Sequence, residues 1–141
     1  MTDIDSLAAE ISEAFTNYSQ DVTNAMKEGI DETAEQAKDI VSSHAPTGQK
    51  NRRYSRKNKM VSRRSGKYKK AITVKTAYDG TFDKRDVVCV KPNEHALAHL
   101  LEKGHAMRQG GRAKSIPHFV YGEDYIERNL QRNIEKKVNG I

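Results

Sequence analysis

The sequence is poor in the residues that build large cores and covalent frameworks. Its 141 residues include no Trp, aromatic residues make up 6%, and hydrophobic residues make up 35%. This length and composition predict a single domain over residues 1–141, with a small core and long exposed extensions that partner subunits would complete. The single cysteine, Cys89, excludes an intramolecular disulfide and is typical of a reducing compartment.

Long hydrophobic runs are absent as well. No apolar run approaches the roughly 20 residues that cross a bilayer. The first residues are acidic, unlike those of a signal or transit peptide. We therefore expect a soluble protein that contacts no membrane and is made and kept in a cytoplasm.

Acidic residues are missing from one long segment of the chain. Residues 48–75 hold twelve bases and no acid, whereas residues 1–41 hold ten acids against Lys27 and Lys38. The formal net charge of +6 conceals this separation. Such a charge dipole predicts an assembly component whose two ends meet different surfaces.

Apolar residues recur every three or four positions through the first third of the chain. This stripe consists of Ile4, Leu7, Ile11, Phe15, Tyr18, Val22, Met26, Ile30, Ala34, Ala37 and Val41. It predicts a long amphipathic helix within residues 1–43, from about Thr2 or Asp3 to Ser42, with a weak point at Gly29. A straight helix of this length would measure about 60 Å. Part of it must therefore pack on another subunit or fold back.

A basic segment, residues 48–66, follows the helix stop at Pro46 and Gly48. It lacks apolar periodicity, so we expect a flexible arm without regular structure. Its basic residues are Lys50, Arg52, Arg53, Arg56, Lys57, Lys59, Arg63 and Arg64. Two interpretations stay open: contact with nucleic-acid phosphates, or ordering against an acidic partner surface. Tyr54 is the only aromatic residue in this segment, which is too few for base stacking.

The remaining residues, 67–141, predict an α+β core. Alternating residues from Lys67 to Tyr78, the turn signal Asp79-Gly80 and the apolar run from Val87 to Val90 indicate an antiparallel hairpin or small sheet. A short helix from about Glu94 to Lys103 would end at Gly104. Three leucines of this helix are expected to anchor the sheet-side core: Leu97, Leu100 and Leu101. A C-terminal amphipathic helix from about Gly122 would pack on the sheet.

Histidines and Glu102 in and around the predicted short helix allow two kinds of chemistry. His95, His99 and His105 with Glu102 could suggest zinc, but paired cysteines are missing, as is a Glu directly after the first histidine. An acid–base pair of Glu102 with His105 or His118 would be typical of a small basic hydrolase. No spacing fixes these residues around a phosphate. We therefore expect no enzyme activity, metal or cofactor, with a hydrolase as the less favoured alternative.

A basic, glycine-rich loop separates the two predicted C-terminal helices. Its glycines permit positive φ and close backbone approach, and its arginines could meet acids of another subunit. The segment lacks both the P-loop lysine and the spacing of a dinucleotide fingerprint. We predict a subunit-contact loop formed by Gly104, His105, Arg108, Gly110, Gly111, Arg112, Pro117 and His118.

Three parts of this stretch carry a resemblance to a known family. The runs LLEKGH from Leu100, RQGGR from Arg108 and PHF from Pro117 closely resemble the signature of the HK-type tail-component (neck) family of long-tailed phages. The upstream run RSGKYKKAI from Arg64 resembles the family's approach to its first strand, and the likeness extends over about residues 3 to 138. Val120-Tyr121-Gly122 depart from the proline and small residue that often follow the PH element.

The resemblance implies a structural virion protein without enzyme activity, placed in the head–tail connection or at tail completion. It further implies a homo-oligomer, such as a ring, with other phage neck or tail proteins as partners. The protein would reside in the virion, and in the host cytoplasm during assembly. The basic arm would then face the DNA channel or an acidic partner ring.

Overall fold

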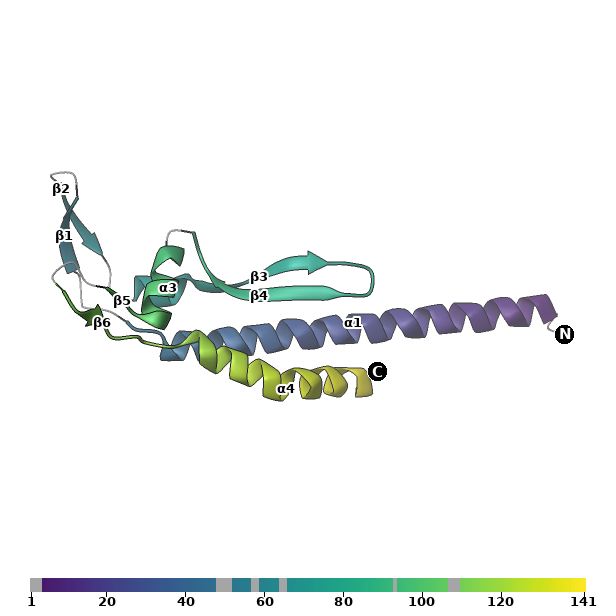
Figure 1. Cartoon of the computed structure of the whole chain (residues 1–141). Coiled ribbons are helices and arrows are strands. Elements are labelled where there is room, and N and C mark those ends of the chain that lie inside the picture. The colour runs from purple at the N-terminus through teal and green to yellow at the C-terminus, as the bar shows by residue number, and fades with distance from the viewer. Residues whose placement is uncertain (1–3, 48–51, 57–58, 64–65, 93, 107–109) are drawn as a thin grey trace.

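A computed structural model describes residues 4–47, 52–56, 59–63, 66–92, 94–106 and 110–141, with the backbone alone for 52–56 and 59–63. The molecule is elongated around one helix, α1 (Ile4–His44), as Figure 1 shows. Helix α4 (Phe119–Asn139) and the hairpin of β3 (Ile72–Asp79) and β4 (Lys84–Val90) lie along its C-terminal half. The predicted α+β fold class is confirmed.

Helix α1 is continuous through Gly29, where the sequence suggested a bend. The glycine marks instead a close approach of α1 to α4, because a Cβ atom at Gly29 would lie 2.9 Å from the Cα of Ile134. Polar groups flank this crossing: the Asn133 amide donates to the Thr33 hydroxyl at 2.9 Å. The predicted start at Thr2 or Asp3 lies outside the described residues.

The β3–β4 hairpin is antiparallel, with Ile72 opposite Val90 and Val74 opposite Val88. Two ion pairs attach its outer end to α1. The Lys27 Nζ lies 2.7 Å from Asp79 Oδ1, and the Lys84 Nζ lies 2.7 Å from Asp31 Oδ1. The hydrogen bond to Asp31 raises the pKa of Lys84, which keeps this link charged.

The hydrophobic core lies at the C-terminal end of α1. Val41, Ala45, Tyr68 and Ile72 are buried there. Partly buried residues from β4, α3 (His95–Lys103) and α4 surround them: Val88, Val90, Leu97, Ala98, Leu101 and Phe119. Leu97 and Leu101 therefore pack as predicted. Leu100 is 41% exposed, so its predicted core role was wrong, because α3 turns only one face toward the sheet.

The structure also corrects several element boundaries. The basic arm was predicted to be irregular, but β1 (Arg52–Arg56) and β2 (Lys59–Arg63) pair as an antiparallel hairpin. Residues Lys67–Ala71 form a short helix, α2, rather than the start of β3. Helix α4 begins at Phe119 instead of near Gly122.

Helix α4 packs mainly along α1, and only its first turn reaches the core beneath the sheet. This arrangement refines the prediction that the C-terminal helix packs on the sheet. Gly122 is buried at this contact, where a Cβ atom would lie 2.5 Å from the Cγ2 of Val41. The two helices can therefore approach closely at both Gly29 and Gly122.

Candidate subunit interface

The N-terminal half of α1 extends beyond the rest of the molecule (Figure 1). We call residues 4–21 the overhang, because every residue in this range is exposed. Five large apolar or aromatic residues form a stripe on one side of it: Ile4, Leu7, Ile11, Phe15 and Tyr18. The same helical face continues into Ala25, Gly29 and Thr33, which are buried. The overhang thus carries a packing face that its own chain leaves uncovered.

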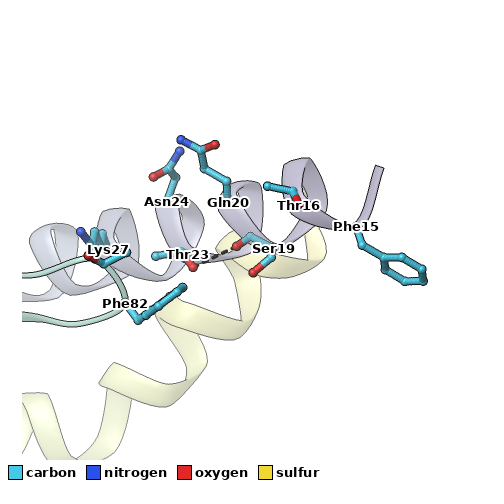
Figure 2. Close-up of a pocket in the computed structure, with 9 residues that line it drawn as sticks. Phe15, Thr16, Ser19, Gln20, Thr23, Asn24, Lys27 and Phe82 are labelled. Atoms are coloured by element: carbon cyan, nitrogen blue, oxygen red, sulfur yellow. Dashed lines mark hydrogen bonds between the residues drawn. The ribbon is translucent and has the colours of Figure 1, made fainter. Parts of the chain in front are cut away.

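A recess at the base of the overhang lies beside the tip of the β3–β4 hairpin. Its lining includes Ser19, Thr23 and Lys27 of α1 and Phe82 of the tip, and its volume is about 610 Å³. Figure 2 shows Phe82 below Lys27, whereas Phe15 projects outward at the far end. Phe82 is 76% exposed. Sequence analysis did not identify Phe82, because the turn signal Asp79-Gly80 does not indicate which side chains at the tip stay exposed.

The structure brings most of the predicted contact loop together in a small turn. Strands β5 (His105–Ala106) and β6 (Arg112–Ala113) pair antiparallel, and Gly110 and Gly111 between them have φ of 90° and 77°. At Gly104, with φ of 72°, a Cβ atom would lie 2.6 Å from the carbonyl oxygen of Ala113. Glycine is therefore required there by both conformation and space.

The exposed side chains of this loop are available for contact. His105, Arg112 and Pro117 are all exposed, and the Arg112 Nη2 donates to the carbonyl oxygen of Lys103 at 3.4 Å. Arg108 lies outside the described residues. So do Lys50, Lys57 and Arg64 of the basic arm. The side chains of its other predicted members, Arg52, Arg53, Arg56, Lys59 and Arg63, are not described.

His118 occupies a different environment from the rest of the predicted loop. Its side chain is fully buried, at 0% exposure. Its Nε2 lies 2.7 Å from the Tyr68 hydroxyl, and its Nδ1 lies 2.9 Å from the Ile116 carbonyl oxygen and 3.1 Å from Glu102 Oε1. His118 thus binds within its own subunit. The prediction that it contacts a neighbouring subunit does not fit this position.

Glu102 joins this buried network to the start of α4. Its Oε1 accepts hydrogen bonds from the backbone N–H groups of His118 at 2.7 Å and Phe119 at 2.8 Å. A carboxylate at a helix N-terminus satisfies donors that lack a partner within the helix. Because carboxylate and carbonyl oxygens only accept, the His118 Nδ1 carries the proton in these contacts. The Glu and His of the signature therefore hold α3, α4 and α2 together.

Sequence analysis missed Tyr68, the third member of this network. Burial raises the pKa of its hydroxyl to about 12, and the Glu102 carboxylate adds to the shift. No sequence spacing links Tyr68 to His118, which lies fifty residues later. The only signal was an aromatic residue within the basic run KYKK.

A second groove lies between β4, α3 and the start of α4, with a volume of about 360 Å³. We call it the head groove. Its apolar lining is formed by Cys89, Val90, Ala98 and Phe119, and its polar lining by His95, His99, Glu102 and Lys103. Cys89 is half-buried. Among the described residues, no three His, Cys, Asp or Glu side chains are arranged to hold a metal ion.

Comparison with known proteins identifies the family. A family model described as "Bacteriophage HK97-gp10, putative tail-component" matches residues 9–104, about two thirds of the chain. The chain therefore belongs to this HK97-gp10-like family of bacteriophage tail components. It is a structural phage tail protein, which places it in the virion.

The family match runs from the overhang to Gly104, so the β5–β6 turn and α4 lie beyond it. No curated protein and no solved structure matches the chain. Within the described parts of the chain, none of the helices is long and apolar enough to cross a membrane.

Proposed function

We propose that this tail component acts by assembling with copies of itself, as a ring in the head–tail connection or at tail completion. The proposal depends on one observation: the overhang exposes an apolar stripe that is continuous with a buried packing face. Contiguous apolar surface of this kind is typical of interaction sites. Other neck or tail proteins of the virion would be its further neighbours.

The energetics favour association through the overhang. Fully burying one large apolar side chain contributes about 1.5–3 kcal/mol. The five stripe residues together could therefore supply on the order of 10 kcal/mol, as an upper estimate. Association costs an estimated 4–15 kcal/mol in lost motional freedom. The stripe is thus large enough to support a weak to moderate interface, and polar contacts around it would add specificity.

The glycine–arginine loop and the basic hairpin give the subunit further contact surfaces. We propose that Arg112 and the exposed turn at Gly110 and Gly111 meet a neighbouring subunit. The hairpin β1–β2, with no acid from residue 48 to 75, would face the DNA channel or an acidic partner ring. A nucleic-acid-binding role through residues 50–70 is the alternative that this charge favours.

Removing the apolar stripe should prevent assembly. We expect a Leu7→Ser, Ile11→Ser, Phe15→Ser variant to remain at the monomer mass of 15.9 kDa at concentrations where the wild-type chain forms multiples of it. Losing three interface side chains should weaken association at least tenfold, because tenfold corresponds to only about 1.4 kcal/mol. Light scattering during size-exclusion chromatography measures the masses directly.

A matched variant keeps this experiment specific. Ser6→Ala, Ala9→Ser, Asn17→Ser changes three exposed residues away from the stripe on the same helix and should assemble like the wild-type chain. Circular dichroism checks that both variants keep their helical content. A wild-type chain that stays monomeric at high concentration, or a stripe variant that assembles normally, would contradict the proposed function.

A further inference from the structure

We propose that the overhang of one copy docks into the head groove of a second copy. This inference rests on the proposed function, since it presumes that copies assemble, and it specifies which surfaces meet. The overhang is the largest uncovered apolar surface on α1, and the head groove is an open hollow with an apolar floor. Charge decides between this pairing and its main alternative, in which two overhangs pair with each other.

Overhang-to-overhang pairing is electrostatically unfavourable. Residues 4–21 contain Asp5, Glu10, Glu13 and Asp21 and no base. Two such helices side by side would bring eight negative charges together with no cation in either segment. Like charges on neighbouring helix faces destabilise the contact. The apolar stripe therefore calls for a partner surface with positive charge around it.

The opposite end of the molecule has that charge. Figure 1 shows β1, β2, α3, β5 and β6 gathered at the end far from the N-terminus. Strands β1 and β2 at this end belong to the acid-free segment of the sequence, residues 48–75. Lys103, Arg112 and Lys114 are exposed there as well. The subunit thus has the acidic overhang at one end and, at the other end, a basic region around the head groove.

The head groove has the composition that an acidic amphipathic helix requires. Val90, Ala98 and Phe119 give it an apolar lining, while the exposed His95, His99 and Lys103 lie around them. The one carboxylate in the groove, Glu102, is already engaged by the N–H groups at the start of α4. Apolar anchors of a helix lying in a groove, with opposite charges at the rim, form a common recognition mode.

This pairing joins two different surfaces and therefore repeats. Each copy would offer its overhang to one neighbour and its head groove to the other. Such a heterologous interface, in which two different surfaces of identical subunits meet, closes into a ring when the rotation between copies allows it. Otherwise it extends as a filament. Overhang-to-overhang pairing would end at a dimer.

The only native thiol lines the head groove, which allows a direct test on the full chain. Cysteine is introduced on the stripe, in three separate variants: Leu7→Cys, Ile11→Cys and Phe15→Cys. A copper catalyst lets dissolved oxygen take the electrons and protons of two nearby thiols, which leaves a disulfide. We expect at least one variant to form a ladder of dimers, trimers and larger species on a non-reducing gel, because each chain then has a thiol on both surfaces.

Three controls define the result. The ladder should disappear when Cys89→Ala is added to the same variant. It should be absent with Ala9→Cys, on the opposite side of the helix, and its yield should fall at high ionic strength, where exposed charges are screened. The wild-type chain, with one thiol, can form no species beyond a dimer.

The other outcomes overturn the inference in distinguishable ways. Disulfide dimers that persist after Cys89→Ala would show that overhangs pair with each other. Assembly by light scattering without any disulfide to Cys89 in the three variants would show that another surface or another partner covers the stripe, while leaving the proposed function intact. A chain that neither assembles nor cross-links would contradict both.

Discussion

Replacing Glu102 with alanine is expected to lower the free energy of unfolding by about 3 kcal/mol. The carboxylate accepts from the N–H groups of His118 and Phe119 and lies 3.1 Å from the His118 Nδ1. Hydrogen bonds to a charged group contribute about 1.5–3 kcal/mol each, and a buried donor left without a partner adds a desolvation penalty. Without these hydrogen bonds, α3 should no longer be held against the first turn of α4.

Urea unfolding followed by circular dichroism measures this change. Glu102→Gln keeps one acceptor oxygen and removes the charge, so it should lose about half as much stability as the alanine variant. Glu127→Ala, an exposed carboxylate later in α4, is the matched control and should change stability by less than about 0.5 kcal/mol. A Glu102→Ala variant as stable as this control would show that Glu102 does not hold the helix start.

The second large effect is a loss of stability at alkaline pH. The pKa of Tyr68 is about 12 in the folded chain, whereas an unperturbed tyrosine has a pKa near 10. Below pH 10 the buried neutral hydroxyl contributes its full stabilisation. Between about pH 10 and 12 the unfolded chain loses this proton while the folded chain keeps it, so stability falls as pH rises. The total loss from this residue should be on the order of 2–3 kcal/mol.

The Tyr68→Phe variant isolates this contribution. It removes the titrating group, so its stability should decline less steeply than that of the wild-type chain between pH 9.5 and 11.5. At pH 7 it should cost about 1 kcal/mol, because the hydroxyl no longer bonds His118. Tyr78→Phe, at an exposed position on the hairpin, serves as the control. Equal pH slopes for Tyr68→Phe and the wild type would contradict the assignment.

Local patterns in the sequence were sufficient for the main elements. The three-and-four spacing from Ile4 to Val41 predicted α1, and the turn signal Asp79-Gly80 predicted the β3–β4 hairpin. Both patterns reflect interactions between neighbours in the chain, which a single sequence contains. The excess length of α1 also indicated that part of it would lie outside the core.

The features that were mispredicted depend on contacts between distant segments. Gly29 has low helix propensity, but the close approach of Ile134 decides its role. His118 was assigned to the subunit-contact loop because its partners, Tyr68 and Glu102, lie far from it in the sequence. The β1–β2 hairpin, in which Tyr54 pairs with Val61, was not predicted. Its dense positive charge is unusual for strands, which are depleted in lysine.

The central claim is that the overhang is covered only when copies assemble. Hydrogen exchange measured by mass spectrometry over a range of protein concentrations tests it most directly. An isolated helix of this length is marginally stable, so the amides of residues 4–21 should exchange quickly in dilute protein. They should become protected as the mass rises, while residues 25–44 stay protected throughout. Protection of residues 4–21 in the monomer, or its absence in the assembled form, would contradict the account.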